Sequence, residues 1–225
     1  MERNKKTAQE LLANMKYAIF DLDGTLLDSM PIWINLGKTV LNPMGIYPDE
    51  DLDKRFKTMT LDQSSRYIKE HFPIDISAEE LLDIFTDTVR KGYEEEAPLK
   101  PYAMDFLKLL HSRKIPMCVA TASERHLTES ALQRTGALPY FEFVMTCTDI
   151  GKTKETPDIY LEAMQRLGGN IQNTVVFEDA YFSVISAKNG GFSVVALFDE
   201  CAKEDGKNIQ KTADLYAQSF FDLMK

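Results

Sequence analysis

Five short apolar runs, separated by amphipathic stretches, organise the sequence. They cover residues 17–22, 116–123, 141–147, 173–179 and 192–198. Continuous apolar runs of this length predict strands that are buried on both faces, as in a parallel sheet. Helical spacing precedes or separates the later runs, at roughly 101–113, 124–135, 157–167 and 181–190. Because strand and helix alternate, the pattern predicts an α/β fold with a Rossmann-like parallel sheet.

Residues 29–97 have a different pattern, since they contain apolar positions at helical spacing and no clear strand run. Ser77 and Glu80 form the spacing of a capping box, which predicts the start of a helix. Pro98 and Pro101 then mark the return to the sheet-forming part of the chain. We therefore expect a core domain from residues 1–28 and 98–225, and a helical cap domain from residues 29–97. We expect an insert at this point to overhang the carboxyl ends of the strands, where open α/β sheets bind ligands.

The composition narrows the range of partners. The chain has 225 residues, of which 44% are hydrophobic and 27% charged, and its formal net charge is -9. An excess of negative charge repels a polyanion, which argues against nucleic acid as a partner. A small phosphorylated metabolite still fits, because local cations and a metal ion can offset the overall charge. The sequence carries no signal for an oligomeric state.

The location of the protein is predicted from what the sequence lacks. The three cysteines show no metal-ligand or redox spacing, which is typical of small core residues in a reducing compartment. No apolar run has the length of a signal peptide or of a membrane span. We therefore expect a cytoplasmic protein without a membrane partner. The leader predicts a short amphipathic helix with Leu11, Leu12 and Met15 on one side.

The first apolar run ends in the segment FDLDGTLLDS at residues 20–29, which contains the strongest chemical signal. Asp21 and Asp23 follow the strand, and Gly24 and Thr25 turn the chain. Alternate side chains of an extended chain share a face. If the strand has ended by Asp23, this residue can instead offer its backbone carbonyl to a metal ion. Asp and Gly are also common turn residues, so a D-x-D-G turn alone would carry little weight.

Three further polar groups lie at or near the ends of later strands. Thr121, in VATAS, closes the second predicted strand, Lys154 lies in GKTKETPDIY, and Glu178 and Asp179 end the run VVFED. Each signal is weak alone, since a single lysine is usually a solvated surface cation and an acidic pair often caps a helix. Their order along the chain, with each at a strand end or nearby loop, gives them weight together.

These four motifs resemble those of the haloacid dehalogenase-like (HAD) hydrolase superfamily, within the β-phosphoglucomutase-like phosphatases. The resemblance extends from about Lys16 to Lys225 and includes the lysine-x-x-Pro-Asp pattern, here Lys154 with Pro157 and Asp158. It implies a HAD-like Rossmann core with a helical-bundle cap inserted after the first strand. It also implies a phosphoric monoester hydrolase that acts on a sugar phosphate or a nucleotide-like metabolite.

The resemblance implies a catalytic role for each motif. Asp21 would attack the phosphorus atom and form an aspartyl-phosphate. Asp23 would protonate the leaving alkoxide and then activate the hydrolytic water. Thr121 and the backbone amide of Ala122 would bind phosphoryl oxygens, and Lys154 would neutralise developing charge.

The same resemblance implies Mg²⁺ as the cofactor. Asp21, the backbone oxygen of Asp23, and Asp179 would be its ligands, with Glu178 acting directly or through water. A hard cation of this kind prefers such oxygen ligands.

Substrate binding involves further predicted residues. Ser123 and Arg125, at the helix start after the second motif, and Arg55 in the cap are candidate contacts. Two alternative functions stay open: a sugar-phosphate mutase, and a non-catalytic phosphate-binding protein. Mutase relatives carry a histidine in the cap where this chain has Trp33, which favours hydrolysis.

Overall fold

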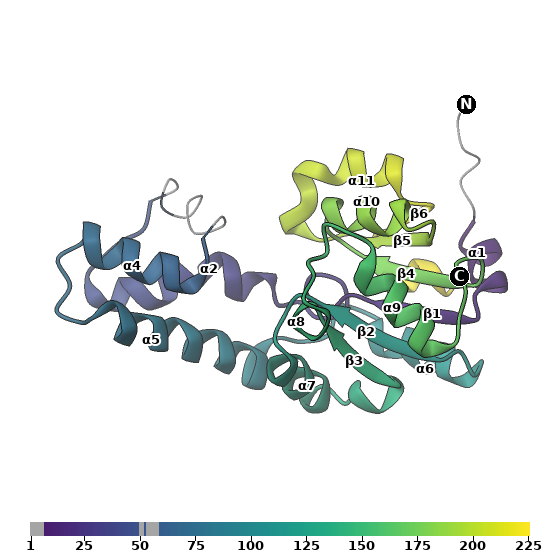
Figure 1. Cartoon of the computed structure of the whole chain (residues 1–225), viewed down its shortest axis with the longest axis horizontal. Helices are drawn as coiled ribbons and strands as arrows, with labels where there is room; N and C mark the ends of the chain where they lie inside the picture. The colour runs from purple at the N-terminus through teal and green to yellow at the C-terminus, as the bar shows by residue number, and fades with distance from the viewer. Residues whose placement is uncertain (1–6, 50–51, 53–58) are drawn as a thin grey trace. The chain divides into compact units, whose positions relative to one another are not determined.

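The computed structural model describes residues 7–49, 52 and 59–225. The chain divides into two compact units, one formed by residues 1–28 and 98–225 and the other by residues 29–97. Figure 1 shows the first unit as a sheet covered by helices and the second as a set of helices. The predicted fold class is confirmed, since a parallel sheet carries a helical insertion after its first strand.

The first unit is built on one six-stranded sheet in the order β3-β2-β1-β4-β5-β6, and every neighbouring pair is parallel. Its five longer strands correspond to the five apolar runs, and the sixth was not predicted. The strands are β1 Tyr17–Phe20, β2 Met117–Thr121, β3 Phe143–Thr146, β4 Thr174–Glu178, β5 Ser193–Leu197 and β6 Leu215–Ala217. This order places β1 between β2 and β4, so three of the four predicted motifs follow neighbouring strands.

Both faces of the sheet are buried, since every residue of β2 and of β4 is buried and successive strand side chains point to opposite sides. On one face, Ile19 and Val176 join a core that includes Tyr160 and Phe192. On the other face, the ring of Phe20 stacks on that of Phe177 with centroids 4.4 Å apart. Buried strands of this kind explain why the apolar runs are continuous rather than alternating.

Helices supply the covering layers of the first unit. Helix α9 packs on β1 and β2, and α10 packs on β4 and β5 (Figure 1). The α-helices of this unit are α1 Ala8–Asn14, α6 Ala103–Ser112, α7 Arg125–Arg134, α8 Cys147–Ile150, α9 Asp158–Leu167, α10 Tyr181–Asn189 and α11 Gly206–Thr212. Three 3₁₀-helices complete it: η3 Leu138–Tyr140, η4 Glu200–Asp205 and η5 Phe220–Leu223.

The leader forms the predicted helix α1, which begins with a capping box between Thr7 and Glu10. Leu11, Leu12 and Met15 are all buried in the structure. Each of these side chains removes apolar surface from water, which ties the start of the described chain to its unit.

The second unit contains helices joined by loops, and no strand among its described residues, as the sequence pattern predicted. It contains α2 Met30–Leu41, η1 Asn42–Met44, α4 Leu61–His71, α5 Ala78–Lys91 and the π-helix η2 Gly92–Glu96. The predicted capping box at the start of α5 is confirmed, since Ser77 Oγ accepts from the Glu80 amide and Glu80 accepts from the Ser77 amide. Helix α5 packs on both α2 and α4. Among the described residues, no helix has the length and apolar character that crossing a membrane requires.

Candidate active site

The carboxyl ends of β1, β2 and β4 gather the predicted polar residues at one edge of the sheet. Asp21 follows the last residue of β1, Thr121 ends β2, and Glu178 ends β4 with Asp179 immediately after it. Because the three strands are parallel neighbours, these side chains share one edge. This is the edge at which open α/β sheets bind ligands.

An acidic cluster lies at this edge. Carboxylate oxygens of Asp21, Glu178 and Asp179 lie within 4.8 Å of one another, and all three residues are buried. Lys154, from the loop before α9, donates from Nζ to Asp21 Oδ1 and to Glu178 Oε1, the latter at 2.6 Å. The structure therefore brings four of the predicted residues into direct contact or close approach.

Burial makes this cluster electrostatically costly. It raises the pKa of Asp21 to about 7, although the nearby Lys154 ammonium opposes the rise. Burial likewise raises the pKa of Asp179 well above its usual range, and the charges of Asp21 and Glu178 add to the effect. For Lys154, burial alone would lower the pKa, but the carboxylates of Asp21 and Glu178 outweigh it and raise the pKa well above its usual value.

The charge balance fits a divalent cation. The Lys154 ammonium pairs with Asp21 and Glu178 but leaves three buried carboxyl groups close together, so a second cation would relieve their mutual repulsion. The available ligand atoms are all oxygens, which is the donor set that Mg²⁺ prefers. The residues present therefore fit the predicted metal.

The turn after β1 depends on Gly24, whose φ of 81° lies in the left-handed region. A Cβ atom at this position would lie 2.8 Å from Asp179 Cγ, so the close approach requires glycine. The next residue, Thr25, donates from Oγ1 to Asp179 Oδ1 at 3.1 Å. The turn thus brings the first motif against the fourth.

Asp23 and the second motif are joined by Ser123. Ser123 Oγ donates to Asp23 Oδ2 at 2.6 Å, and the Ser123 amide donates to Thr121 Oγ1 at 3.0 Å. Thr121 is buried, whereas Ala122 between them is exposed. Asp23 of the first motif and Thr121 of the second are therefore linked through Ser123 by hydrogen bonds.

The sequence model of the family of haloacid dehalogenase-like hydrolases matches residues 18–197, a span that contains all four motifs. The chain belongs to this family.

The relatives of this hydrolase include enzymes named for phosphorylated sugars. Fructose-1-phosphate phosphatase YqaB of Escherichia coli is 30% identical over 177 residues, which cover 79% of this chain and 93% of the relative. The structure of CbbY from Rhodobacter sphaeroides in complex with xylulose-(1,5)-bisphosphate has a TM-score of 0.72 and 19% identity, covering 92% of this chain and 95% of that chain. A β-phosphoglucomutase from Clostridium difficile has a TM-score of 0.68 and 19% identity, covering 91% of each chain. At these identities, the two structures show the shared fold.

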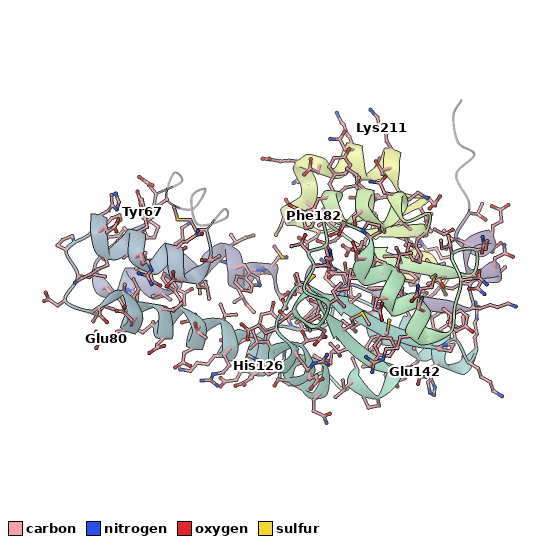
Figure 2. The ribbon with its side chains drawn as sticks, in the orientation of Figure 1. Tyr67, Glu80, His126, Glu142, Phe182 and Lys211 are labelled. Atoms are coloured by element: carbon pink, nitrogen blue, oxygen red, sulfur yellow. The ribbon has the colours of Figure 1, made fainter. Side chains whose placement is uncertain are left out.

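Two arginines, Arg125 and Arg55, were predicted to contact the substrate, and the structure describes only the first of them. The guanidinium of Arg125 donates to Asp149 at 2.6 Å, to Glu129 at 3.1 Å and to the Val144 carbonyl at 3.1 Å. These partners lie on α7, β3 and α8 rather than in the acidic cluster, so substrate binding by Arg125 stays a prediction. Arg55 lies outside the described residues. His126, the residue after Arg125 on the first turn of α7, is labelled in Figure 2.

Sequence reasoning missed Tyr160 of this hydrolase. Its hydroxyl donates to Glu178 Oε1 at 2.7 Å, and its side chain is fully buried. The residue lies two positions after Asp158 of the third motif, on the first turn of α9. Its closeness to the third motif was the one feature of the sequence that could have indicated a role in the site. A tyrosine at this position, however, also has the spacing of an ordinary core residue.

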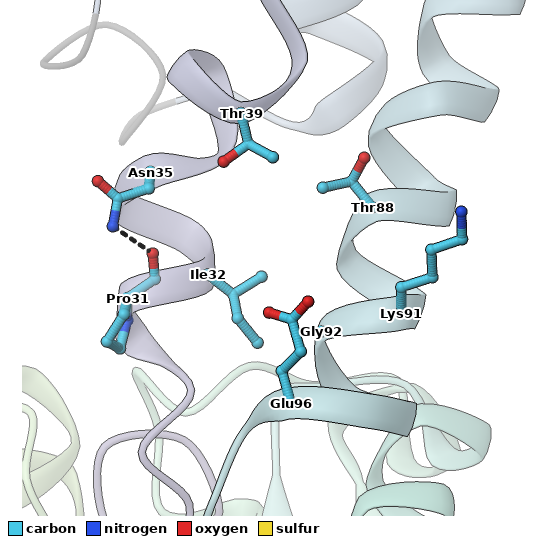
Figure 3. A pocket seen from close by; sticks show the side chains of 8 residues that line it. All are labelled: Pro31, Ile32, Asn35, Thr39, Thr88, Lys91, Gly92 and Glu96. Atoms are coloured by element: carbon cyan, nitrogen blue, oxygen red, sulfur yellow. Dashed lines mark hydrogen bonds between the residues drawn. The ribbon is translucent and has the colours of Figure 1, made fainter.

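The helical unit has its own pocket, shown in Figure 3. It has a volume of about 460 Å³ and lies between α2 and the end of α5 with η2. Its lining residues are Pro31, Ile32, Asn35, Thr39, Thr88, Lys91, Gly92 and Glu96. Trp33, on α2, donates from Nε1 to the hydroxyl of Tyr93 at 3.1 Å. The indole N–H of Trp33 is therefore held within this unit.

Proposed function

We propose that this hydrolase is a Mg²⁺-dependent phosphatase that cleaves a phosphate monoester of a small metabolite, most specifically a sugar phosphate, through an aspartyl-phosphate on Asp21. The contact of Asp21 with the buried Lys154, inside a cluster of carboxylates at the strand edge, carries this proposal. Membership of a hydrolase family and the 30% identity to a fructose-1-phosphate phosphatase support it.

The proposed metal ligands are Asp21, Asp179 and the backbone oxygen of Asp23, with Glu178 acting directly or through water. When bound, Mg²⁺ would neutralise charge on the phosphoryl group and on the surrounding carboxylates. The acidic cluster described above supports this assignment through its burial and its all-oxygen donor set.

Asp21 is the proposed nucleophile. One carboxylate oxygen of Asp21 attacks phosphorus, and the bond from phosphorus to the ester oxygen breaks, so that an acyl phosphate and an alkoxide form. Lys154 contacts the other oxygen, Asp21 Oδ1, which orients the carboxylate. In this proposal the same ammonium would lie beside the phosphoryl oxygens of the bound substrate. A water molecule then attacks phosphorus, inorganic phosphate leaves, and the Asp21 carboxylate is restored.

Asp23 is the proposed acid and base. It gives a proton to the departing alkoxide and takes one from the attacking water, so its charge is restored after each cycle. The hydrogen bond from Ser123 Oγ to Asp23 Oδ2 fixes the orientation of the carboxyl group. Ser123 thus acts on Asp23 in this proposal, in addition to its predicted place near the substrate.

Thr121 and Ala122 are the proposed phosphoryl-binding groups. A hydroxyl group has one donor and two acceptor sites. Thr121 Oγ1 accepts from the Ser123 amide, so its O–H can be donated to a phosphoryl oxygen. The backbone amide of Ala122 would supply a second donor next to it.

The mutase alternative is disfavoured by Trp33. A mutase must return the phosphoryl group to a second hydroxyl of the sugar, which needs an acid or base at that hydroxyl, and mutase relatives carry a cap histidine where this chain has Trp33. The indole of Trp33 does not titrate at neutral pH, and its N–H is donated to Tyr93. Hydrolysis needs no such group. A non-catalytic phosphate-binding protein would have no need of the paired Asp21 and Lys154.

The test is release of inorganic phosphate from a panel of sugar phosphates and p-nitrophenyl phosphate, with Mg²⁺ or EDTA. Asp21→Asn should lose at least about a thousandfold in kcat, whereas the exposed acid variant Asp105→Asn should retain wild-type activity. Isomerisation of a sugar phosphate without phosphate release would indicate the mutase. Binding of sugar phosphates without turnover would indicate the binding protein.

A further inference from the structure

The ring of Tyr160 is fixed by the core rather than by the site. Tyr160 is the third residue of α9 and is completely buried. Its ring meets that of Phe192 edge-on, with centroids 6.3 Å apart and planes at 68°. Because interiors are close-packed, a buried ring of this kind holds its hydroxyl oxygen in one place. Only rotation of the O–H bond is left to the group.

This fixed hydroxyl meets a carboxylate oxygen that already has a partner. Tyr160 donates to Glu178 Oε1 at 2.7 Å, and Lys154 Nζ donates to the same oxygen at 2.6 Å. The other oxygen, Glu178 Oε2, accepts from the amide of Asp179 at 3.3 Å. Lys154, Tyr160 and the adjacent Asp179 amide therefore set the orientation of the Glu178 carboxylate together.

The Lys154 ammonium is shared between two carboxylates, and Tyr160 affects how it is shared. A hydrogen bond from the phenol offsets part of the negative charge on Glu178 Oε1, which weakens the attraction of this oxygen for Lys154. Among the residues that the structure describes, Asp21 Oδ1 accepts no corresponding second hydrogen bond, so its attraction for the same ammonium is not offset in this way. The Nζ atom also lies 5.7 Å from the centroid of the Tyr160 ring, which is within the range of a cation–π attraction.

We propose that Tyr160 is a positioning residue of the hydrolase, whose O–H holds Glu178 Oε1 so that Lys154 stays on Asp21 and is not captured by Glu178. The inference rests on the proposed function, because it assigns Lys154 to the phosphoryl group beside Asp21. Tyr160 touches no reacting atom in this account. It acts through Glu178 and Lys154.

The first test is Tyr160→Phe, which keeps the ring and removes only the hydroxyl. Since the neutralising role of Lys154 strengthens in the transition state, kcat should fall about tenfold while KM changes less than about twofold. Tyr216→Phe is the matched control, because Tyr216 packs against the same core from β6, and its activity should stay within about twofold of wild type. 4-Aminophenylalanine at position 160 keeps an N–H donor and should restore most of the lost kcat. Its failure to do so would overturn the proposal.

The second test is a double-mutant cycle with Glu178→Gln. If Tyr160 acts through Glu178, Tyr160→Phe should cost less than about twofold in kcat when Glu178 is already replaced. An undiminished tenfold loss in that background would contradict the proposal, as would no loss in the single variant.

A third measurement does not depend on turnover. Mn²⁺ binding to the Tyr160→Phe protein, followed by electron paramagnetic resonance, should be no weaker than to wild type, since no carboxylate is removed. Lost Mn²⁺ binding together with lost kcat would instead indicate local collapse, and would overturn the positioning role. A wild-type protein without phosphatase turnover would refute the proposed function. Full activity of Tyr160→Phe beside an active wild type would refute this inference alone.

Discussion

Replacing Asp21 with asparagine should stabilise the metal-free protein while removing its activity. Burial raises the pKa of Asp21 from its usual 3.8 to about 7, even with Lys154 opposing the rise. This difference corresponds to on the order of 4 kcal/mol for ionising the group in the folded state. Asparagine resembles the protonated carboxyl in shape and carries no charge, so it avoids this cost.

The sign of the effect follows from proton linkage. The raised pKa means that the folded state binds more protons at Asp21 than the unfolded chain between about pH 4 and pH 7. The contribution of Asp21 to stability is therefore fully present below pH 4 and is lost as the pH rises through 7. Asp21→Asn does not titrate, so its advantage over wild type should be absent at pH 4 and complete above pH 7.

The assay is thermal unfolding in EDTA, followed across this pH range. For a chain of this size, an advantage of this order should raise the Tm of Asp21→Asn by about 10 °C at pH 8. The exposed substitution Asp105→Asn serves as the control and should show no such trend. Saturating Mg²⁺ should stabilise wild type more than Asp21→Asn and so narrow the gap. Equal Tm values for wild type and Asp21→Asn at pH 8 in EDTA would refute the electrostatic reasoning.

Three further substitutions test separate parts of the site. Asp23→Asn should lower kcat about a hundredfold for alkyl phosphates and much less for p-nitrophenyl phosphate, whose leaving group needs no proton; equal losses on both would argue against the acid role. Lys154→Met should lower kcat about a hundredfold in steady-state assays, because it leaves two buried carboxylates without their cation, and retained kcat would exclude charge neutralisation by Lys154. Gly24→Ala should weaken Mn²⁺ binding in a direct titration, because its Cβ would press on Asp179, and unchanged affinity would show that this close approach is not needed.

Much of the fold could be predicted because buried parallel strands leave continuous apolar runs. The run 17–22 also contains the point where the strand ends and the predicted catalytic residues begin, since β1 ends at Phe20 and Asp21 follows it. Strand β6 could not be found in this way. It has only three residues, Leu215–Ala217, and lies at the edge of the sheet, where burial on both faces is not required.

Residues of the candidate site could be predicted from the sequence only where they belong to a recognisable motif. Asp21, Lys154 and Glu178 could be expected to meet, because their motifs follow strands or a nearby loop in a known order. Arg125 shows the limit of this reasoning, because its partner Asp149 lies 24 residues away and nothing in the sequence links the two. Tyr160 shows another limit, because a donor inside a core is visible only when its acceptor is placed in space.

The central claim is that the carboxylate of Asp21 becomes covalently phosphorylated. It is tested most directly by quenching the enzyme during turnover of a sugar phosphate and reducing the acyl phosphate with borohydride. Peptide mass spectrometry should then find homoserine at position 21 in wild type, and unmodified residues in a sample without substrate. Rapid turnover with no modification at Asp21, or with the modification at another carboxylate, would contradict the account.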